Sequence, residues 1–208
     1  MNPFFSIVIA TYNRENLITR AIDSVVNQDT NDWELIIVDD CSLDKTFDRI
    51  KSFFTDERIF YFKTDKNSGV AKARNLGISK SIGRYITFLD SDDEYKKNHL
   101  SVRYDLLENQ NIDLLHGGVE IIGNRKVPDK NNKNKLIDIS ECIIGGTFFI
   151  NSNIDENLKL FDEKIDYSED SELFEKFRRK NMKILKTDYQ TYIYYRDTED
   201  SICNTVNE

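Results

Sequence analysis

Strand-like and helix-like segments alternate along the first half of this chain. The strand-like segments are short and rich in β-branched and aromatic residues, and they span residues 4–10, 33–38, 59–62 and 85–89. Between them, apolar side chains recur at helical spacing in residues 14–28, 44–54 and 70–82. This alternation predicts right-handed crossovers and therefore an α/β fold, with a mostly parallel, Rossmann-like sheet flanked by helices on both faces.

The second half has a less regular pattern. We expect helices at residues 97–109 and 168–180, and strand-like runs at residues 113–122, 142–150 and 182–195. Residues 124–135 are rich in Lys and Asn and contain a proline, which is typical of a mobile loop or a hairpin tip. With 208 residues and no linker-like stretch, the chain is expected to form a single domain.

The composition restricts the partners of the protein. A formal net charge of −8 argues against general affinity for nucleic acid or anionic membrane, although a local basic patch is compatible with it. No apolar run approaches the roughly 20 residues that span a bilayer, so we expect a cytoplasmic protein and leave open contact with the inner face of the membrane. Three scattered cysteines and two histidines indicate neither a disulfide framework nor a zinc site.

Three acidic side chains follow the apolar run that ends at Leu89. Asp90, Asp92 and Asp93 repel one another at close range, and Mg²⁺ or Mn²⁺ would relieve that repulsion while leaving positions for phosphate oxygens. Residues 11–13 and 39–42 also follow predicted parallel strands, so all three segments should meet at the sheet edge where such folds bind ligands. Taken alone, the cluster is equally compatible with a solvated acidic turn.

A series of motifs resembles the family 2 glycosyltransferases in order and spacing. The motifs are residues 6–14, Gln28, residues 34–44, 67–77 and 90–93, and the pair Glu169 and Asp170. That family has the GT-A fold and transfers a sugar from a nucleotide-sugar donor with inversion. The resemblance implies one catalytic domain over residues 1–208, with a nucleotide-binding half at 1–95 and an acceptor-side half at 96–208. It also implies a UDP-sugar donor, a saccharide or lipid-linked acceptor, and a Mn²⁺ or Mg²⁺ cofactor.

The resemblance assigns donor-binding roles in the first half. Tyr12 would stack on the base, and Asp40 would accept the imide N–H of uracil. Asp90 would contact the ribose or the donor sugar, and Asp92 would hold the metal that neutralises the departing diphosphate. Arg74 would either pair with a donor phosphate or orient the acidic cluster. The same resemblance adds Ala10, Arg14, Asn67 and Ser91 to the donor site.

The acceptor side is implied by residues of the second half. Asp170 matches the family's general base, which removes the proton from the acceptor hydroxyl, and Glu169 precedes it. Gly145 and Gly146 fall where the family has an acceptor-side loop. Asp93 would either orient the acidic cluster through hydrogen bonds or begin the next helix. Residues 194–202 resemble a segment that closes over the donor phosphates, with Arg196 a weak contributor.

One position departs from the family pattern. Cys41 stands where the family usually has glycine, so we expect the turn after Asp40 to avoid positive φ.

Simpler roles and other functions remain open at this stage. Tyr12 is also compatible with a purely structural anchor, Asp39 and Asp40 with helix capping, Arg74 with an ordinary surface arginine, and Asp170 with a helix-dipole position. Residues 36–40 resemble the acidic pair of receiver domains, but that pair belongs on a first strand. A nucleotidyltransferase would want a glycine-rich loop after the first strand, and residues 10–14 contain no glycine. A non-catalytic nucleotide-sugar-binding protein is the remaining alternative. Oligomeric state is left open.

Overall fold

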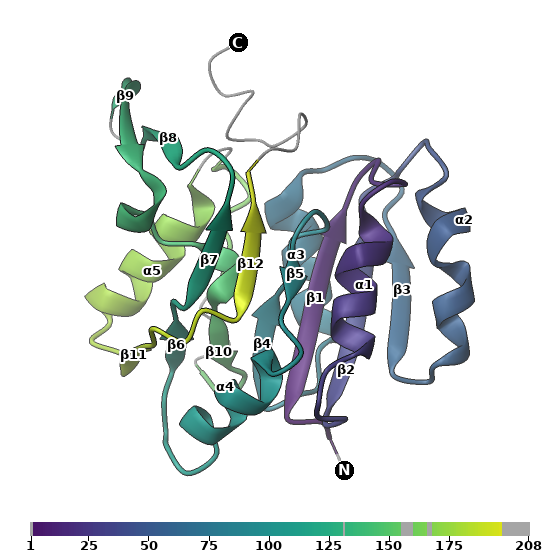
Figure 1. The fold of residues 1–208 in the computed structure, drawn as a ribbon, viewed down its shortest axis with the longest axis horizontal. Coiled ribbons are helices and arrows are strands. Elements are labelled where there is room, and N and C mark those ends of the chain that lie inside the picture. The colour runs from purple at the N-terminus through teal and green to yellow at the C-terminus, as the bar shows by residue number, and fades with distance from the viewer. Residues whose placement is uncertain (1, 131, 155–159, 166–167, 197–208) are drawn as a thin grey trace.

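The computed structural model describes residues 2–130, 132–154, 160–165 and 168–196, and it confirms the α/β fold. The strands of its central sheet are β1 (Phe5–Thr11), β2 (Trp33–Asp39), β3 (Ile59–Lys63), β4 (Tyr85–Phe88), β6 (Leu114–His116), β10 (Phe149–Asn151) and β11 (Ile184–Lys186). They lie in the order β11-β6-β10-β4-β1-β2-β3 (Figure 1). Strand β10 runs antiparallel to β4 and β6, and the other described pairs are parallel. The sheet is therefore mostly parallel, as predicted.

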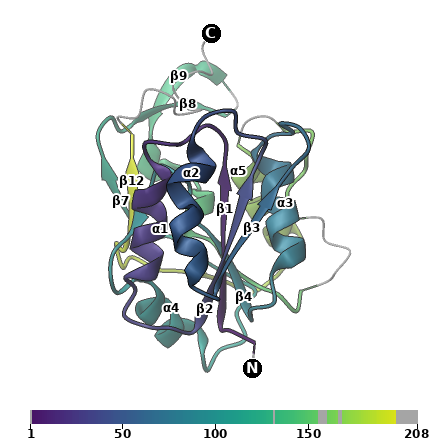
Figure 2. The ribbon, with the colours of Figure 1, turned by 90° about the vertical axis from the view of Figure 1, so that its right-hand side faces the viewer.

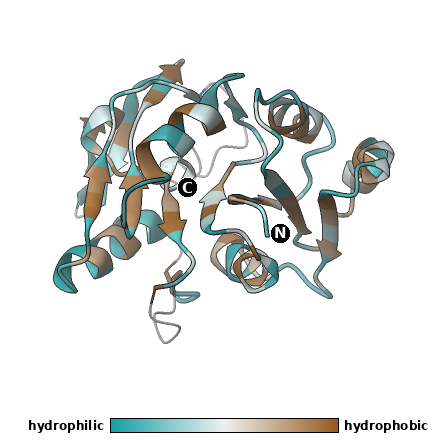
Figure 3. Ribbon diagram, turned by 90° about the horizontal axis from the view of Figure 1, so that it is seen from below, coloured by the Kyte–Doolittle hydropathy of each residue, from teal (hydrophilic) through white to brown (hydrophobic). Residues whose placement is uncertain are grey.

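Helices cover both faces of this sheet. Helices α1 (Ile18–Val26), α2 (Thr46–Ile50) and α4 (His99–Leu107) lie on one face, and α3 (Val70–Lys80) and α5 (Glu169–Arg179) lie on the other (Figure 2). Strand β1 serves both layers because successive side chains of a strand point to opposite faces. Ile7 and Ile9 join the first hydrophobic cluster, and Val8 joins the second. Figure 3 shows hydrophobic residues along most of the strands.

Two smaller sheets lie beside the central one. The first contains β5 (Glu94–Tyr95), β7 (Val119–Ile122) and β12 (Tyr192–Tyr195), and the second is a hairpin of β8 (Lys126–Asp129) and β9 (Asn132–Asp138). The hairpin confirms one of the two structures expected for the Lys- and Asn-rich stretch. Gly117 and Gly118 adopt φ of 92° and 76°, which lets the chain leave β6 and enter another sheet at β7. A Cβ on Gly118 would lie 2.1 Å from the Tyr189 carbonyl oxygen, so this crossing requires glycine.

Four predicted elements were wrong in extent. The first helix begins at Ile18, not at Arg14, and the N–H groups of Arg14 and Glu15 donate to Thr46 and Asp44 in a neighbouring loop. The predicted helix at 44–54 is α2 followed by a 3₁₀ helix, η1 (Lys51–Thr55). Within residues 142–150, Gly145–Thr147 form a 3₁₀ turn, η3, ahead of β10. Residues 182–195 supply β11 and β12 to two different sheets.

Candidate functional site

A cavity of about 650 Å³ lies beyond the carboxyl ends of β1, β2 and β4; we call it the central cavity. Loops after these strands line one side of it, and the start of α5 with the Cys142–Gly145 segment lines the other. The predicted site residues that line it are Ala10, Tyr12, Arg14, Asp40, Asn67, Arg74, Asp90, Ser91, Asp92, Gly145, Glu169 and Asp170. Gly146 does not line it, and a Cβ there would lie 2.3 Å from the Tyr192 hydroxyl oxygen. The fold thus brings twelve of the thirteen predicted site residues to one cavity.

The Asp40 carboxylate organises the loop that leads into α3. Its Oδ2 accepts hydrogen bonds from the N–H groups of Ser68 and Gly69 at 2.8 and 2.7 Å, and its Oδ1 accepts one from the Thr64 hydroxyl at 2.8 Å. The side chain is nearly fully buried yet lines the cavity, while Tyr12 beside it is 38% exposed. Because a carboxylate has about four acceptor positions, Asp40 retains capacity for a ligand N–H.

The turn after Asp40 corrects an expectation. Cys41 adopts φ of 66°, so the cysteine occupies the left-handed conformation that the family's glycine favours. That conformation costs a non-glycine residue roughly 1 kcal/mol. Hydrogen bonds on both sides of the turn hold it: the Ser42 N–H donates to Asp39 at 2.7 Å, and the Ser42 hydroxyl accepts from the Asn13 N–H at 2.9 Å.

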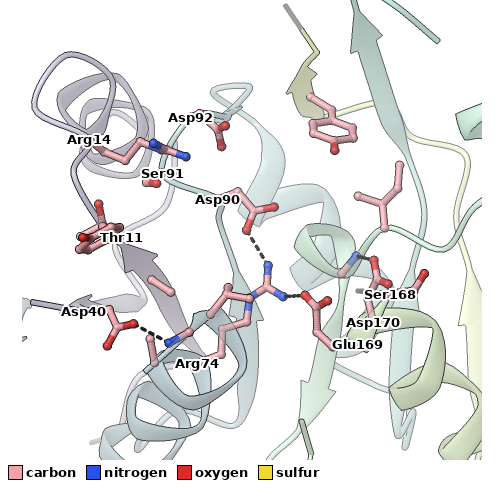
Figure 4. A pocket seen from close by; sticks show the side chains of 18 of the residues that line it. Thr11, Arg14, Asp40, Arg74, Asp90, Ser91, Asp92, Ser168, Glu169 and Asp170 are labelled. Atoms are coloured by element: carbon pink, nitrogen blue, oxygen red, sulfur yellow. Dashed lines mark hydrogen bonds and ion pairs between the residues drawn. The ribbon is translucent and has the colours of Figure 1, made fainter. Parts of the chain in front are cut away.

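Arg74 is buried between two carboxylates. Its Nη2 lies 2.6 Å from Asp90 Oδ1 and its Nη1 lies 2.6 Å from Glu169 Oε1 (Figure 4). These contacts raise the pKa of Arg74 despite its burial, through the charges of Asp90 and Glu169. Arg74 is therefore paired with the acidic cluster and is not a surface arginine. Glu169, which we expected on the acceptor side, lines the cavity but is held by Arg74, and any acceptor contact by it stays a prediction.

Asp93 lies buried behind the acidic cluster and is hydrogen-bonded to strand β12. It is fully buried, and it accepts hydrogen bonds from the Tyr192 hydroxyl at 2.7 Å and the Tyr195 N–H at 2.9 Å. Burial, followed by the charges of Asp90 and Asp92, raises its pKa well above the ordinary range. It leads into strand β5 and does not begin a helix. Of its two expected roles, orientation through hydrogen bonds is the one the structure supports.

Asp92 lies on the cavity side of the same loop. Figure 4 shows its carboxylate beyond that of Asp90, on the same side of the cavity as Arg14 and Ser91. Arg20 donates a hydrogen bond to the Asp92 main-chain carbonyl, which fixes the loop below the side chain. The described residues contain no group of three or more His, Cys, Asp or Glu side chains able to hold a metal by themselves.

Asp170 lies across the central cavity from Asp40 and Asp92. Its Oδ2 accepts the Gly145 N–H at 3.0 Å, and its Oδ1 accepts the Ser171 N–H at 2.7 Å. Burial and the neighbouring charge of Glu169 raise the pKa of Asp170 to about 7, against the opposing effects of Arg74 and of the two N–H groups. The glycine at 145 permits this contact, because a Cβ there would lie 2.9 Å from the Asp170 Cβ.

No sequence pattern identified part of the cavity wall. Val127 on β8, Ile139 after β9, and Ile143 line the central cavity. They are ordinary apolar residues in sequence, and their place in the cavity wall depends on where tertiary folding puts the hairpin. Of the expected closing segment, Tyr194 lines the cavity and Arg196 is buried, while residues 197–202 lie outside the described residues.

Sequence comparison decides the family. Residues 6–184 match the family described as Glycosyl transferase family 2. The chain belongs to glycosyl transferase family 2. A relative from Escherichia coli, named UDP-Glc:alpha-D-GlcNAc-diphosphoundecaprenol beta-1,3-glucosyltransferase WfgD, is 36% identical over 146 residues, covering 67% of this chain and 56% of that protein. The uncharacterized glycosyltransferase RT0329 of Rickettsia typhi is 32% identical over 193 residues, covering 86% of this chain and 59% of that protein. The chain thus spans less than two thirds of either relative.

Solved structures share the fold of this family member. Staphylococcus aureus TarS 1–349 in complex with UDP-GlcNAc superposes with a TM-score of 0.80 at 23% identity, covering 97% of this chain and 60% of that one. The mannosyltransferase PcManGT from Pyrobaculum calidifontis, solved with GDP-Man and Mn²⁺, gives a TM-score of 0.75 at 15% identity, covering 98% and 59%. The fold is therefore GT-A. Among the described helices, none has both the length and the apolarity needed to cross a bilayer.

Proposed function

We propose that this protein transfers a sugar from a UDP-sugar to a hydroxyl group of a saccharide or lipid-linked acceptor, with inversion at the anomeric carbon. The observation that carries the proposal is the position of Asp170, which faces Asp40 and Asp92 across one cavity and has a pKa of about 7. The name of the relative WfgD, a glucosyltransferase that uses UDP-Glc and a diphosphoundecaprenol-linked acceptor, supports UDP and a lipid-linked acceptor class.

The chemistry follows from the two sides of the cavity. Tyr12 and Asp40 hold the uracil ring of the donor, and Asp90 contacts the ribose or the donor sugar. Asp170 takes the proton of the acceptor hydroxyl while that oxygen bonds to the anomeric carbon. The bond from that carbon to the diphosphate oxygen breaks, and its electron pair leaves with UDP. A base with a pKa near the working pH suits this proton transfer, and the two N–H donors on Asp170 keep its carboxylate directed.

The residues present fit a divalent metal that is shared with the donor. Mg²⁺ is usually held by one or two carboxylates together with substrate phosphates, so a full cage of protein ligands is not required. Asp92 would hold the ion beside Asp90, whose other contact, Arg74, fixes its orientation. When bound, the metal stabilises negative charge on the departing diphosphate.

UDP release should be detectable, and it should depend on metal. With a panel of UDP-sugars and candidate acceptors, we expect release of UDP in the presence of Mn²⁺ or Mg²⁺ and its loss on chelation. Asp92→Asn should raise the metal concentration needed for half-maximal rate at least tenfold. Even the loss of a residue that only supports a metal ligand typically lowers metal affinity by about 10- to 100-fold. A luminescent UDP assay measures both. Release unaffected by chelation, or no release and no UDP binding with any donor, would contradict the proposal.

The pH dependence of the rate should report Asp170. Because only the deprotonated carboxylate can accept a proton, kcat should rise about tenfold per pH unit below pH 7 and level off above it. The measurement is kcat at saturating donor and acceptor between about pH 5 and pH 9, a range that brackets this pKa. A flat profile across pH 7 would argue against a base with the environment described for Asp170.

A further inference from the structure

The β8–β9 hairpin carries a charge opposite to that of the whole chain. Residues 125–138 contain five basic and two acidic residues, a net charge of +3, whereas the chain carries −8. Both carboxylates are engaged within the hairpin: Asp138 pairs with Arg125 at 3.0 Å, and Asp129 accepts the Asn132 N–H at 3.1 Å. Lys126, Lys130 and Lys135 are exposed. The hairpin is therefore a local basic patch.

The two sides of the hairpin differ in chemistry. Val127 is 3% exposed and lines the central cavity, and Ile139, just after the hairpin, does the same. On the outside, Leu136 is 57% exposed and follows Lys135 directly. Exposed leucine next to lysines is the combination found on protein surfaces that rest on anionic bilayers.

The hairpin projects at the edge of the sheet where the central cavity opens. Figure 1 shows β8 and β9 beyond the body of the molecule, at the end where the arrows of β1 and β12 point. Its basic outer side thus lies beside the mouth of the cavity, while Val127 on its inner side lines the same cavity as Asp170.

We propose that the β8–β9 hairpin is a docking surface for an anionic phospholipid membrane. The lysines would contact lipid head groups and Leu136 would enter the interface, which would bring the mouth of the central cavity to the surface that carries a lipid-linked acceptor. The link to a lipid-linked acceptor rests on the proposed function, whereas membrane binding by the hairpin does not. A compact phosphate site is less consistent with the observations, because three solvent-exposed lysines are spread over the hairpin: Lys126 on β8, Lys130 in the turn and Lys135 on β9.

Vesicle binding tests the proposal with the full chain. We expect co-sedimentation with vesicles of phosphatidylcholine and phosphatidylglycerol, and little with phosphatidylcholine alone. Each lysine near an anionic surface contributes about fivefold to binding, so the variant K126Q/K130Q/K135Q, which removes three, should bind roughly 100-fold more weakly. Added salt should weaken binding of the parent protein, because the attraction is screened.

A matched triple variant separates the hairpin from total charge. K72Q/K97Q/K183Q removes the same charge from exposed lysines outside the hairpin and should bind the vesicles like the parent protein. Equal binding by the two triple variants would overturn the proposal, and so would release of the parent by inorganic pyrophosphate at matched ionic strength, which would indicate a compact diphosphate site. UDP binding, measured by equilibrium dialysis, should be the same in all three proteins. Its absence from all of them would contradict the proposed function and leave the vesicle result unaffected.

Discussion

Replacing Asp170 with asparagine is expected to abolish sugar transfer and to leave UDP binding intact. Asparagine keeps the shape of the side chain but cannot accept the acceptor proton, and loss of a positioned base slows a reaction by about 10²- to 10⁴-fold. Asp170 is across the cavity from Tyr12 and Asp40, so the nucleotide site should be unchanged. The measurements are the rate of UDP release with donor and acceptor present, and the dissociation constant of UDP.

Glu172→Gln is the matched control for that substitution. It removes one negative charge from the same first turn of α5, but Glu172 does not line the central cavity and pairs with Arg179. We expect its transfer rate to stay within about twofold of the parent, because Glu172 lies outside the cavity. Loss of its exposed pair with Arg179 should cost about 1 kcal/mol or less of stability, so the variant should remain folded. A transfer rate for Asp170→Asn equal to that of the control would show that another group is the base.

The folded state of Asp170→Asn can be checked by thermal unfolding. The raised pKa means that the folded protein holds the Asp170 proton more tightly than the unfolded chain, so this group's contribution to stability is lost as pH rises from about 4 to about 7. Asparagine removes that penalty but can accept only one of the two hydrogen bonds from Gly145 and Ser171. The effects oppose each other, and we expect the Tm at pH 7 to change by less than about 4 °C.

Hydrophobic periodicity predicted the central part of the fold. Strand β1 has a run of apolar residues from Ile7 to Ala10, with Ile7 and Ile9 packed on one face and Val8 on the other. A strand buried on both sides belongs in a parallel sheet covered by helices. The carboxyl ends of parallel strands share one edge, so the meeting of Tyr12, Asp40 and Asp92 in one cavity followed from the same reasoning.

Long-range contacts decided what periodicity could not. Nothing in the local sequence separates Arg14 from the helix that follows. In the structure Arg14 lies before the helix, and its N–H donates to the Thr46 hydroxyl, 32 residues further along the chain. The same holds for Cys41, whose positive φ is maintained by hydrogen bonds from Ser42 and Asn13. The hairpin wall of the cavity also depends on tertiary folding, because Val127 is an unremarkable apolar residue in sequence.

Arg74→Met is expected to lower the free energy of unfolding by about 3–5 kcal/mol, because it leaves Asp90 and Glu169 without the cation between them. For a chain of this size the corresponding fall in Tm is roughly 10 °C. Arg84→Met is the control: Arg84 is exposed and contacts the Phe4 ring and the Glu108 carbonyl, so its loss should cost about 1 kcal/mol or less. Urea denaturation at pH 7 measures both changes.

If unpaired charge causes the loss of stability in Arg74→Met, neutralising Asp90 and Glu169 should restore it. Combining Arg74→Met with Asp90→Asn and Glu169→Gln removes all three charges, and such replacements of buried ion pairs recover most of the stability that a single removal loses. Failure of this rescue would mean that Arg74 stabilises the fold through packing against Phe88 and Phe161 and not through its two carboxylates. Because the charge of Arg74 also lowers the pKa of Asp170, Arg74→Lys, which keeps that charge but not the paired geometry, should transfer sugar with a pH midpoint close to that of the parent.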